Sequence, residues 1–340
     1  MSNRKWLLEN ADVPIRYNLV HEQSLVEGLL SNEEVSAWLQ RLAGRVAARD
    51  LSNIHGSHDY RYENIMKKCF ILGLNAAIPQ FDSSARFFID FLSRHITETY
   101  GEVLTFGKMY AYRDYETILA CCLPFFGYCD EPAVRYVVDK RLQILYNFTK
   151  QKRYDVCRPC LDYAGVPPEW RAHIIDPDLY SDGNIALPSI HDYILLAGAY
   201  RCLGREDKAK AETVAEWLFG QGYEGVYPRF YYYAPHDPSY KAKAVNAKVD
   251  LSGNNLFACF ILSHFEAARS SDWFAGLMTV CGTYKTPEGR FVFPKQMIAE
   301  KKDGEHMNVG EAKRDKLYAE IISTYWMERI LSNCQEVSYD

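Results

Sequence analysis

Apolar residues recur at helical spacing along most of the chain, beginning with the segment 31–48. A serine and an asparagine suited to the N-cap position open this segment, and two glutamates place negative charge in its first turn. The apolar positions that follow are Val35, Trp38, Leu39, Leu42 and Val46. This period of about 3.6 residues predicts an amphipathic α-helix.

The same period predicts further helices of two alternating kinds. The segments 115–126 and 190–203 are apolar nearly all round, whereas 131–149 and 205–219 have a polar or charged face. Because a helix that is apolar on every side must be buried, the first kind is expected inside the protein. The remaining predicted helices are 63–72, 83–97, 255–268, 273–280 and 315–332.

Each unit of the pattern is an apolar helix, a glycine, a short polar turn and an amphipathic helix. Gly73, Gly127 and Gly204 stand at the ends of apolar helices, where glycine commonly terminates a helix. Strand signals are confined to 230–233 and 291–293, which predict a small hairpin at most. We therefore expect an all-α protein of repeated helical hairpins, with apolar helices in an inner ring and amphipathic helices around them.

Closure of this ring would give an α/α toroid, also called an α/α barrel, and would hide the end repeats that an open array must cap. No linker with a marked Gly, Ser or Pro bias divides the chain, so residues 1–340 are predicted to form a single domain. Three long loops, 154–189, 222–253 and 286–310, are expected at one rim, where they would roof a central cavity.

Composition limits the kind of partner. Hydrophobic residues make up 48% of the chain, and the net charge of −5 argues against nucleic acid as a partner. No run of about 18 apolar residues predicts a transmembrane segment, and the first residues lack the apolar stretch of a signal peptide. The ten cysteines show no regular disulfide spacing. We therefore expect a cytoplasmic protein with reduced cysteines; the sequence leaves its oligomeric state open.

Aromatic residues are numerous: 25 Tyr, 17 Phe and 6 Trp. Tyrosine combines an apolar ring with a hydroxyl group, so it suits either packing between helices or the lining of a cavity. Both readings remain open, and the second predicts an aromatic-lined cavity for a small molecule.

Three short motifs carry a resemblance to a known family. The segment 6–17 has an acidic or Asn-containing turn, a proline and an apolar-Arg-Tyr helix start. The segment 221–227 is similar to a Gln-x-x-x-Gly-x-Trp repeat, with Tyr227 in place of Trp, and 286–291 is similar to a second, degenerate copy. With its helix-Gly-turn-Pro-helix units, the chain resembles the prenyltransferase and squalene-cyclase-like (terpenoid cyclase-like) α/α toroid proteins.

The resemblance implies an α/α toroid and an isoprenoid-handling activity, but two family features are missing. Class II terpene cyclases of the family protonate their substrate with an Asp-x-Asp-Asp motif, which this sequence lacks. The zinc ligands of protein prenyltransferases are separated Asp, Cys and His residues, and no spacing here identifies such a set. A shared fold does not transfer an activity.

Polar clusters at the expected rim are the candidate catalytic groups. His55, His58 and Asp59 lie between two predicted helices, where two imidazoles and a carboxylate suit acid–base chemistry or part of a metal site. A turn held by capping hydrogen bonds is the alternative. His191 and Asp192 begin an apolar helix, so they either face the cavity or cap the helix. The candidates for substrate binding at the equivalent place on an earlier helix are Arg113, Asp114, Tyr115 and Glu116, which alternatively pair with one another.

A tyrosine-rich loop is the second candidate for substrate binding, through Tyr227, Tyr231, Tyr232, Tyr233 and His236. Aromatic faces stabilise cations and also stack on sugar rings, while packing of the loop on the helices is the alternative. No metal site is predicted, because the Cys-x-x-Cys motif at 157–160 has no second pair of ligands. No cofactor is predicted, because neither a Gly-x-Gly-x-x-Gly loop nor a P-loop is present.

Three hypotheses of function follow, and the sequence does not decide whether the protein is an enzyme. The first is an isoprenoid-handling enzyme, related to cyclases or prenyltransferases, with an aromatic central cavity and an apolar or cationic ligand. The second is a non-catalytic binding or scaffold toroid, because no diagnostic catalytic motif is present. The third is a carbohydrate-active α/α barrel, either a lyase or a hydrolase.

Overall fold

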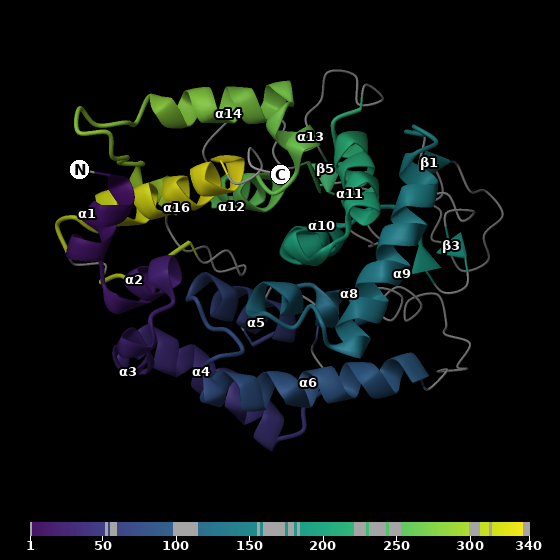
Figure 1. The fold of residues 1–340 in the computed structure, drawn as a ribbon, viewed down its shortest axis with the longest axis horizontal. Helices are drawn as coiled ribbons and strands as arrows, with labels where there is room; N and C mark the ends of the chain where they lie inside the picture. The colour runs from purple at the N-terminus through teal and green to yellow at the C-terminus, as the bar shows by residue number, and fades with distance from the viewer. Residues whose placement is uncertain are drawn as a thin grey trace.

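The structure is a computed structural model, and it shows an all-helical protein (Figure 1). It describes residues 2–51, 54, 60–97, 115–154, 157–158, 174–175, 180–181, 184–220, 229–230, 243–244, 253–298, 307–312 and 315–335. The all-α class predicted from the helical period is therefore confirmed. Among the described residues, no helix combines the length and apolar character needed to cross a membrane.

The N-terminal half of the structure confirms several of the predicted helices. Asn32 caps α4, because its side chain accepts hydrogen bonds from the backbone N–H groups of Glu34 and Val35. The helices here are α1 (Asn3–Asn10), α2 (Val13–Val20), α3 (Val26–Ser31), α4 (Glu33–Ala47), α5 (Tyr62–Ile71) and α6 (Pro79–Thr97), with a 3-10 turn η1 (Gln23–Leu25).

Further along, three of the predicted helices are divided, and in one of them, 190–203, the α-helix gives way to a 3-10 turn at Tyr200–Cys202. The segment 115–126 is a short helix followed by a 3-10 turn, because Pro124 has no backbone N–H to continue the α-helical pattern. The segment 255–268 is likewise split into two helices. The elements are α8 (Tyr115–Ala120), η2 (Leu123–Phe126), α9 (Pro132–Thr149), α10 (Ile190–Ala199), η5 (Tyr200–Cys202), α11 (Arg205–Leu218), α12 (Gly253–Leu262), α13 (Glu266–Arg269), α14 (Asp272–Gly282), α15 (Lys295–Ile298) and α16 (Tyr318–Gln335).

The described residues contain three antiparallel pairs of strands, and each strand is two residues long. They are β1 (Cys157–Arg158) with β2 (Ile174–Ile175), β3 (Tyr180–Ser181) with β4 (Asn184–Ile185), and β5 (Arg229–Phe230) with β6 (Lys243–Ala244). Phe291, in the second predicted strand segment, forms one isolated bridge with Lys285.

Apolar and amphipathic helices take different places in the structure. In Figure 1, α6, α9, α11 and α14 lie at the periphery, while α5, α8, α10 and α12 lie nearer the middle. The central helices contact one another in chain order, α5 with α8, α8 with α10, and α10 with α12, and α12 then contacts α16. The peripheral helices also follow one another, since α6 contacts α9 and α9 contacts α11. The apolar helix α10 is accordingly buried along nearly its whole length.

The end of α5 shows how one glycine brings two helices together. Gly73 has a φ of +84°, and a Cβ atom there would lie 2.5 Å from Nδ2 of Asn18 on α2. Asn18 is buried and donates hydrogen bonds to the carbonyl oxygens of Pro14 and Ile71, at 3.1 and 3.2 Å. The absence of a side chain at Gly73 therefore lets the C-terminal ends of α2 and α5 approach closely.

Candidate functional site

Most of the side chains predicted for the site lie outside the described residues. These are His55, His58, Asp59, Arg113, Asp114, Tyr227, Tyr231, Tyr232, Tyr233 and His236. Tyr115 is the first residue of α8, and its side chain is not among those described. For these positions the sequence-based hypotheses remain predictions.

Glu116 pairs with a residue that the sequence did not indicate. Its carboxylate lies 2.8 Å from Nζ of Lys140, which joins α8 to α9. Both side chains are partly exposed, so the ion pair contributes only modestly to stability.

Asp192 is the third residue of α10 and forms a capping box with the N-cap residue Ser189. Its fully buried carboxylate accepts hydrogen bonds from the backbone N–H and the hydroxyl of Ser189, at 2.8 and 2.9 Å, and completes a capping box. It also accepts hydrogen bonds from Nε and Nη2 of Arg141 on α9, at 2.8 and 3.1 Å. Four hydrogen bonds satisfy this carboxylate, which supports the capping interpretation of Asp192.

His191 forms a buried pair with a residue that the sequence analysis missed. Its Nε2 lies 2.6 Å from Oε2 of Glu63, and each side chain is 10% exposed. Glu63 is in the first turn of α5, where an acidic residue also fits the helix dipole. Because an acidic residue is common in the first turn of a helix, nothing in the sequence indicated that Glu63 contacts α10.

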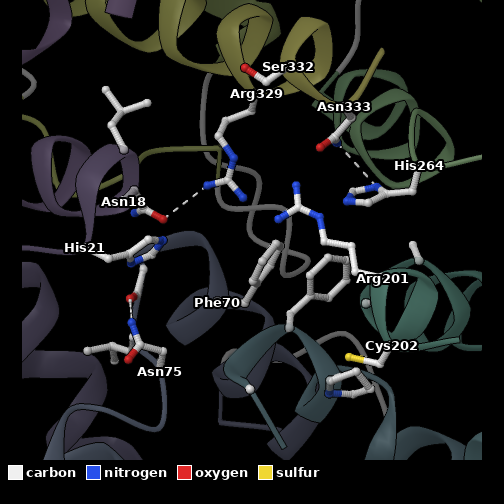
Figure 2. A pocket seen from close by; sticks show the side chains of 18 of the residues that line it. Asn18, His21, Phe70, Asn75, Arg201, Cys202, His264, Arg329, Ser332 and Asn333 are labelled. Carbon is white, nitrogen blue, oxygen red and sulfur yellow. Dashed lines mark hydrogen bonds between the residues drawn. The ribbon is translucent and has the colours of Figure 1, made fainter. Parts of the chain in front are cut away.

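A separate cationic pocket lies at the opposite, C-terminal ends of the same helices (Figure 2). Its volume is about 430 Å³. The residues that follow α2, α5, η2 and α12 contribute to its wall, together with the ends of α10 and α16 and the start of α1. The pocket is thus formed by segments from both termini and the middle of the chain.

Three arginines give this pocket its charge. Arg4, Arg201 and Arg329 line it, and none of its described lining residues is an aspartate or glutamate. Figure 2 shows the guanidinium groups of Arg201 and Arg329 projecting into the middle of the space. Nη1 of Arg329 donates to the hydroxyl of Tyr325 at 3.0 Å and to Oδ1 of Asn18 at 3.3 Å.

Helix ends explain how three like charges are held together. The carbonyl groups at a helix C-terminus carry partial negative charge and stabilise nearby cations. Arg4 interacts with such a carbonyl group, because its guanidinium donates a hydrogen bond to the carbonyl oxygen of Leu19 in the last turn of α2. The gathering of several C-terminal ends around the cavity therefore favours cationic side chains there.

Two histidines, His21 and His264, also line the pocket. Burial lowers the pKa of His264 to about 4, and the charges of Arg329 and Arg201 act in the same direction. Burial also lowers the pKa of His21, with further lowering by Arg329 and Arg4. Both imidazoles are therefore neutral near pH 7.

Phenylalanine rings form an apolar surface beside the arginines. The centroids of Phe70 and Phe125, both in the pocket wall, lie 4.4 Å apart, and Phe260 lies 5.8 Å from Phe70. A Cβ atom at Gly198 would come within 2.8 Å of the ring of Phe125, so glycine is needed there. The pocket combines positive charge with aromatic surface, which suits an anion that carries an apolar part.

The comparisons with known proteins give no match. No model of a known protein family matches the chain, and no curated protein or solved structure is detectably similar to it. In the part of the chain that the structure describes, no group of three or more His, Cys, Asp or Glu side chains is placed to hold a metal ion.

Proposed function

We propose that this protein binds a small organic anion in the cationic pocket, with guanidinium groups on the anionic end and phenylalanine rings against the apolar part. The convergence of Arg4, Arg201 and Arg329 on one cavity carries this proposal. Guanidinium groups match phosphate and carboxylate oxygens with paired hydrogen bonds. The volume of about 430 Å³ lies within the range of small-molecule sites.

We also propose that the helices close into an α/α toroid. Helix contacts run from α5 through α8, α10 and α12 to α16, and α16 contacts α1. Asn18 of α2 supports closure, because it donates to the carbonyl oxygen of Ile71 on α5 and accepts from Arg329 on α16. In a toroid, the cationic pocket is one mouth of the ring; the prediction that the long loops roof the cavity falls mostly outside the described residues.

The isoprenoid hypothesis is compatible with this pocket through one kind of ligand. A prenyl diphosphate has an anionic head for the arginines and an apolar chain for Phe70 and Phe125. The pocket exceeds roughly 300 Å³, the lower end of small-molecule sites. We therefore propose an isoprenoid-handling protein whose ligand enters by its charged end. Binding of an apolar or cationic ligand that has no anionic group remains a prediction, and it rests on the tyrosine-rich loop.

A non-catalytic binding protein is the second candidate. It is favoured by Asp192 and Glu116, because both carboxylates are held in ion pairs and hydrogen bonds within the fold. The carbohydrate hypothesis depends on loop residues outside the described part of the chain, and no described feature favours it.

The test is to measure binding of pyrophosphate and of geranyl diphosphate by isothermal titration calorimetry. We expect both to bind, with added salt weakening binding because charges contribute. Arg329→Gln should weaken binding about tenfold or more, the loss expected for a charge-assisted hydrogen bond. Arg135→Gln is the matched control, since Arg135 is exposed on α9 and pairs with Asp139.

The outcomes separate the proposals. If neither anion binds the folded protein, the anion-binding function is wrong. If pyrophosphate binds and geranyl diphosphate binds no more tightly, the isoprenoid part is wrong and the anion site stands. Mass spectrometry of geranyl diphosphate after incubation distinguishes an enzyme, which changes the ligand, from a binding protein, which returns it unchanged.

A further inference from the structure

Two neutral imidazoles in a wall that already carries three guanidinium groups raise a question about the charge of the ligand. Figure 2 shows His21 and His264 on opposite sides of the space into which Arg201 and Arg329 project. A neutral imidazole has one nitrogen that accepts and one that donates a hydrogen bond, whereas a protonated imidazole donates from both. The protonation state of these rings therefore decides what they offer to a bound anion.

The tautomer of His264 follows from its backbone contacts. Its Nδ1 lies 3.1 Å from the carbonyl oxygen of Phe260 and 3.1 Å from that of Ile261, and a carbonyl oxygen can only accept. The amide nitrogen of Asn333 lies farther from Nδ1, at 3.4 Å. The two shorter carbonyl contacts therefore assign the hydrogen of the neutral ring to Nδ1 and a lone pair to Nε2. In this form Nε2 repels an anion, and after proton uptake it donates a hydrogen bond to one.

The groups around each ring are mostly cationic or aromatic. Arg329 of α16 and Arg201 of η5 act on His264, which also contacts the rings of Phe125 and Phe260. Arg329 and Arg4 of α1 act on His21.

Two further titratable groups lie near His21 and Arg4. His21 packs edge-on against the phenol of Tyr17. The carboxyl of Glu328 on α16 has a pKa that is raised by burial, while the nearby guanidinium of Arg4 acts in the opposite direction. Glu328 is not among the described residues that line the pocket.

We propose that the pocket selects ligands that carry at least two negative charges at one end, and that His21 and His264 take up protons from solvent when such a ligand binds. This inference rests on the anion-binding function proposed above. Each negative charge of a bound anion favours the protonated form of the imidazoles beside it. A ligand with two charges at one end therefore favours proton uptake more than a ligand with one, and the donors gained on both rings strengthen its binding in turn.

Linkage fixes the direction of the pH dependence. If the bound state has the higher histidine pKa, affinity is independent of pH above that bound-state value. Below it, affinity rises by up to about tenfold per pH unit for each histidine as the pH falls, until the free-state pKa is reached. A ligand with one charge is expected to show a smaller rise.

The experiment uses two probes whose own charge does not change with pH: methanedisulfonate, with two negative charges, and methanesulfonate, with one. The histidine Cε1–H signals of the full chain are followed by NMR as the pH is varied. With nine histidines in the chain, the variants His21→Gln and His264→Gln identify the two signals. We expect methanedisulfonate to raise both histidine pKa values by about 1–3 units, and methanesulfonate to raise them by less.

Calorimetry in two buffers of different ionisation enthalpy gives an independent count of the protons taken up. His264→Gln keeps a neutral donor near the Nε2 position, so the protein should still bind methanedisulfonate while taking up fewer protons. His264→Asn keeps a donor near the Nδ1 position and serves if the first variant does not fold.

Three results can be told apart. If neither pyrophosphate nor methanedisulfonate binds, the anion-binding function itself is wrong. Binding of methanedisulfonate without proton uptake, or equal binding of both sulfonates, overturns this inference and leaves that function intact. Proton uptake that persists unchanged in both His264 variants and in His21→Gln also overturns it.

Discussion

His21 occupies the left-handed region of backbone conformation, with a φ of 52°, at the C-terminal end of α2. A residue with a Cβ atom pays about 1–2 kcal/mol for this conformation, and glycine avoids the cost. Its N–H donates to the carbonyl oxygen of Tyr17 at 2.7 Å, which terminates the helix. The histidine therefore stands where glycine would be more stable, and its place in the pocket wall gives a reason for its presence.

A comparison of two variants tests this strain. His21→Ala keeps the Cβ atom and loses the imidazole, while His21→Gly loses both. We expect the free energy of unfolding of the glycine variant to be about 1 kcal/mol higher than that of the alanine variant, because only glycine relieves the strain of the left-handed backbone conformation. Urea denaturation followed by circular dichroism gives both values. Equal stability of the two variants would show that the backbone at this position carries no strain.

At the scale of elements, α9 and α10 are joined by a buried ion pair. Both Asp192 and Arg141 are almost completely buried, and the same carboxylate caps α10. Capping of α10 by Asp192 was one of the two interpretations that the sequence left open. The link of Asp192 to α9 was not indicated by the sequence, because an arginine fifty-one positions away gives no local signal.

Asp192→Asn tests this junction. The amide keeps the shape of the side chain but takes the negative charge away from a buried guanidinium, which should lower the free energy of unfolding by about 3–5 kcal/mol. Glu116→Gln provides the comparison, because its pair with Lys140 is partly exposed and should cost about 1 kcal/mol or less. Equal losses in thermal or urea unfolding would mean that burial of the Asp192 pair does not matter.

For the whole molecule, stability below neutral pH should depend on His264. Burial lowers the pKa of His264 to about 4, below its ordinary value of 6.5, so the unfolded chain takes up a proton first as the pH falls. The free energy of unfolding therefore falls between pH 6.5 and 4, by at most about 3 kcal/mol from this group. Glu311 acts in the opposite direction, because burial raises its pKa to about 7 and its contribution increases as the pH falls.

The difference between the wild type and His264→Gln isolates the histidine. We expect the unfolding free energy of the variant to decline less than that of the wild type as the pH is lowered from 7 to 4.5. Saturating methanedisulfonate should reduce the decline of the wild type, because a bound anion favours the protonated ring. A constant difference between the two proteins across this pH range would contradict the assigned cause.

The sequence by itself determined the helical class, an N-cap at Ser31 or Asn32 and the ends of several helices, because each depends on residues within a turn or two of one another. It went wrong locally at Pro124, where a predicted continuous helix becomes a 3-10 turn. It also directed attention to the starts of the apolar helices, where His191 and Asp192 lie, and not to their opposite ends.

Only the tertiary structure decided which side chains meet. Arg4 and Arg329 come from the two ends of the chain and line one cavity with Arg201. In the sequence each is an ordinary cation on a helix or beside one. Their convergence depends on how the helices pack and on close approaches such as that of Gly73 to Asn18. Helical periodicity records which face of a helix is buried, but it does not record which other helix covers that face.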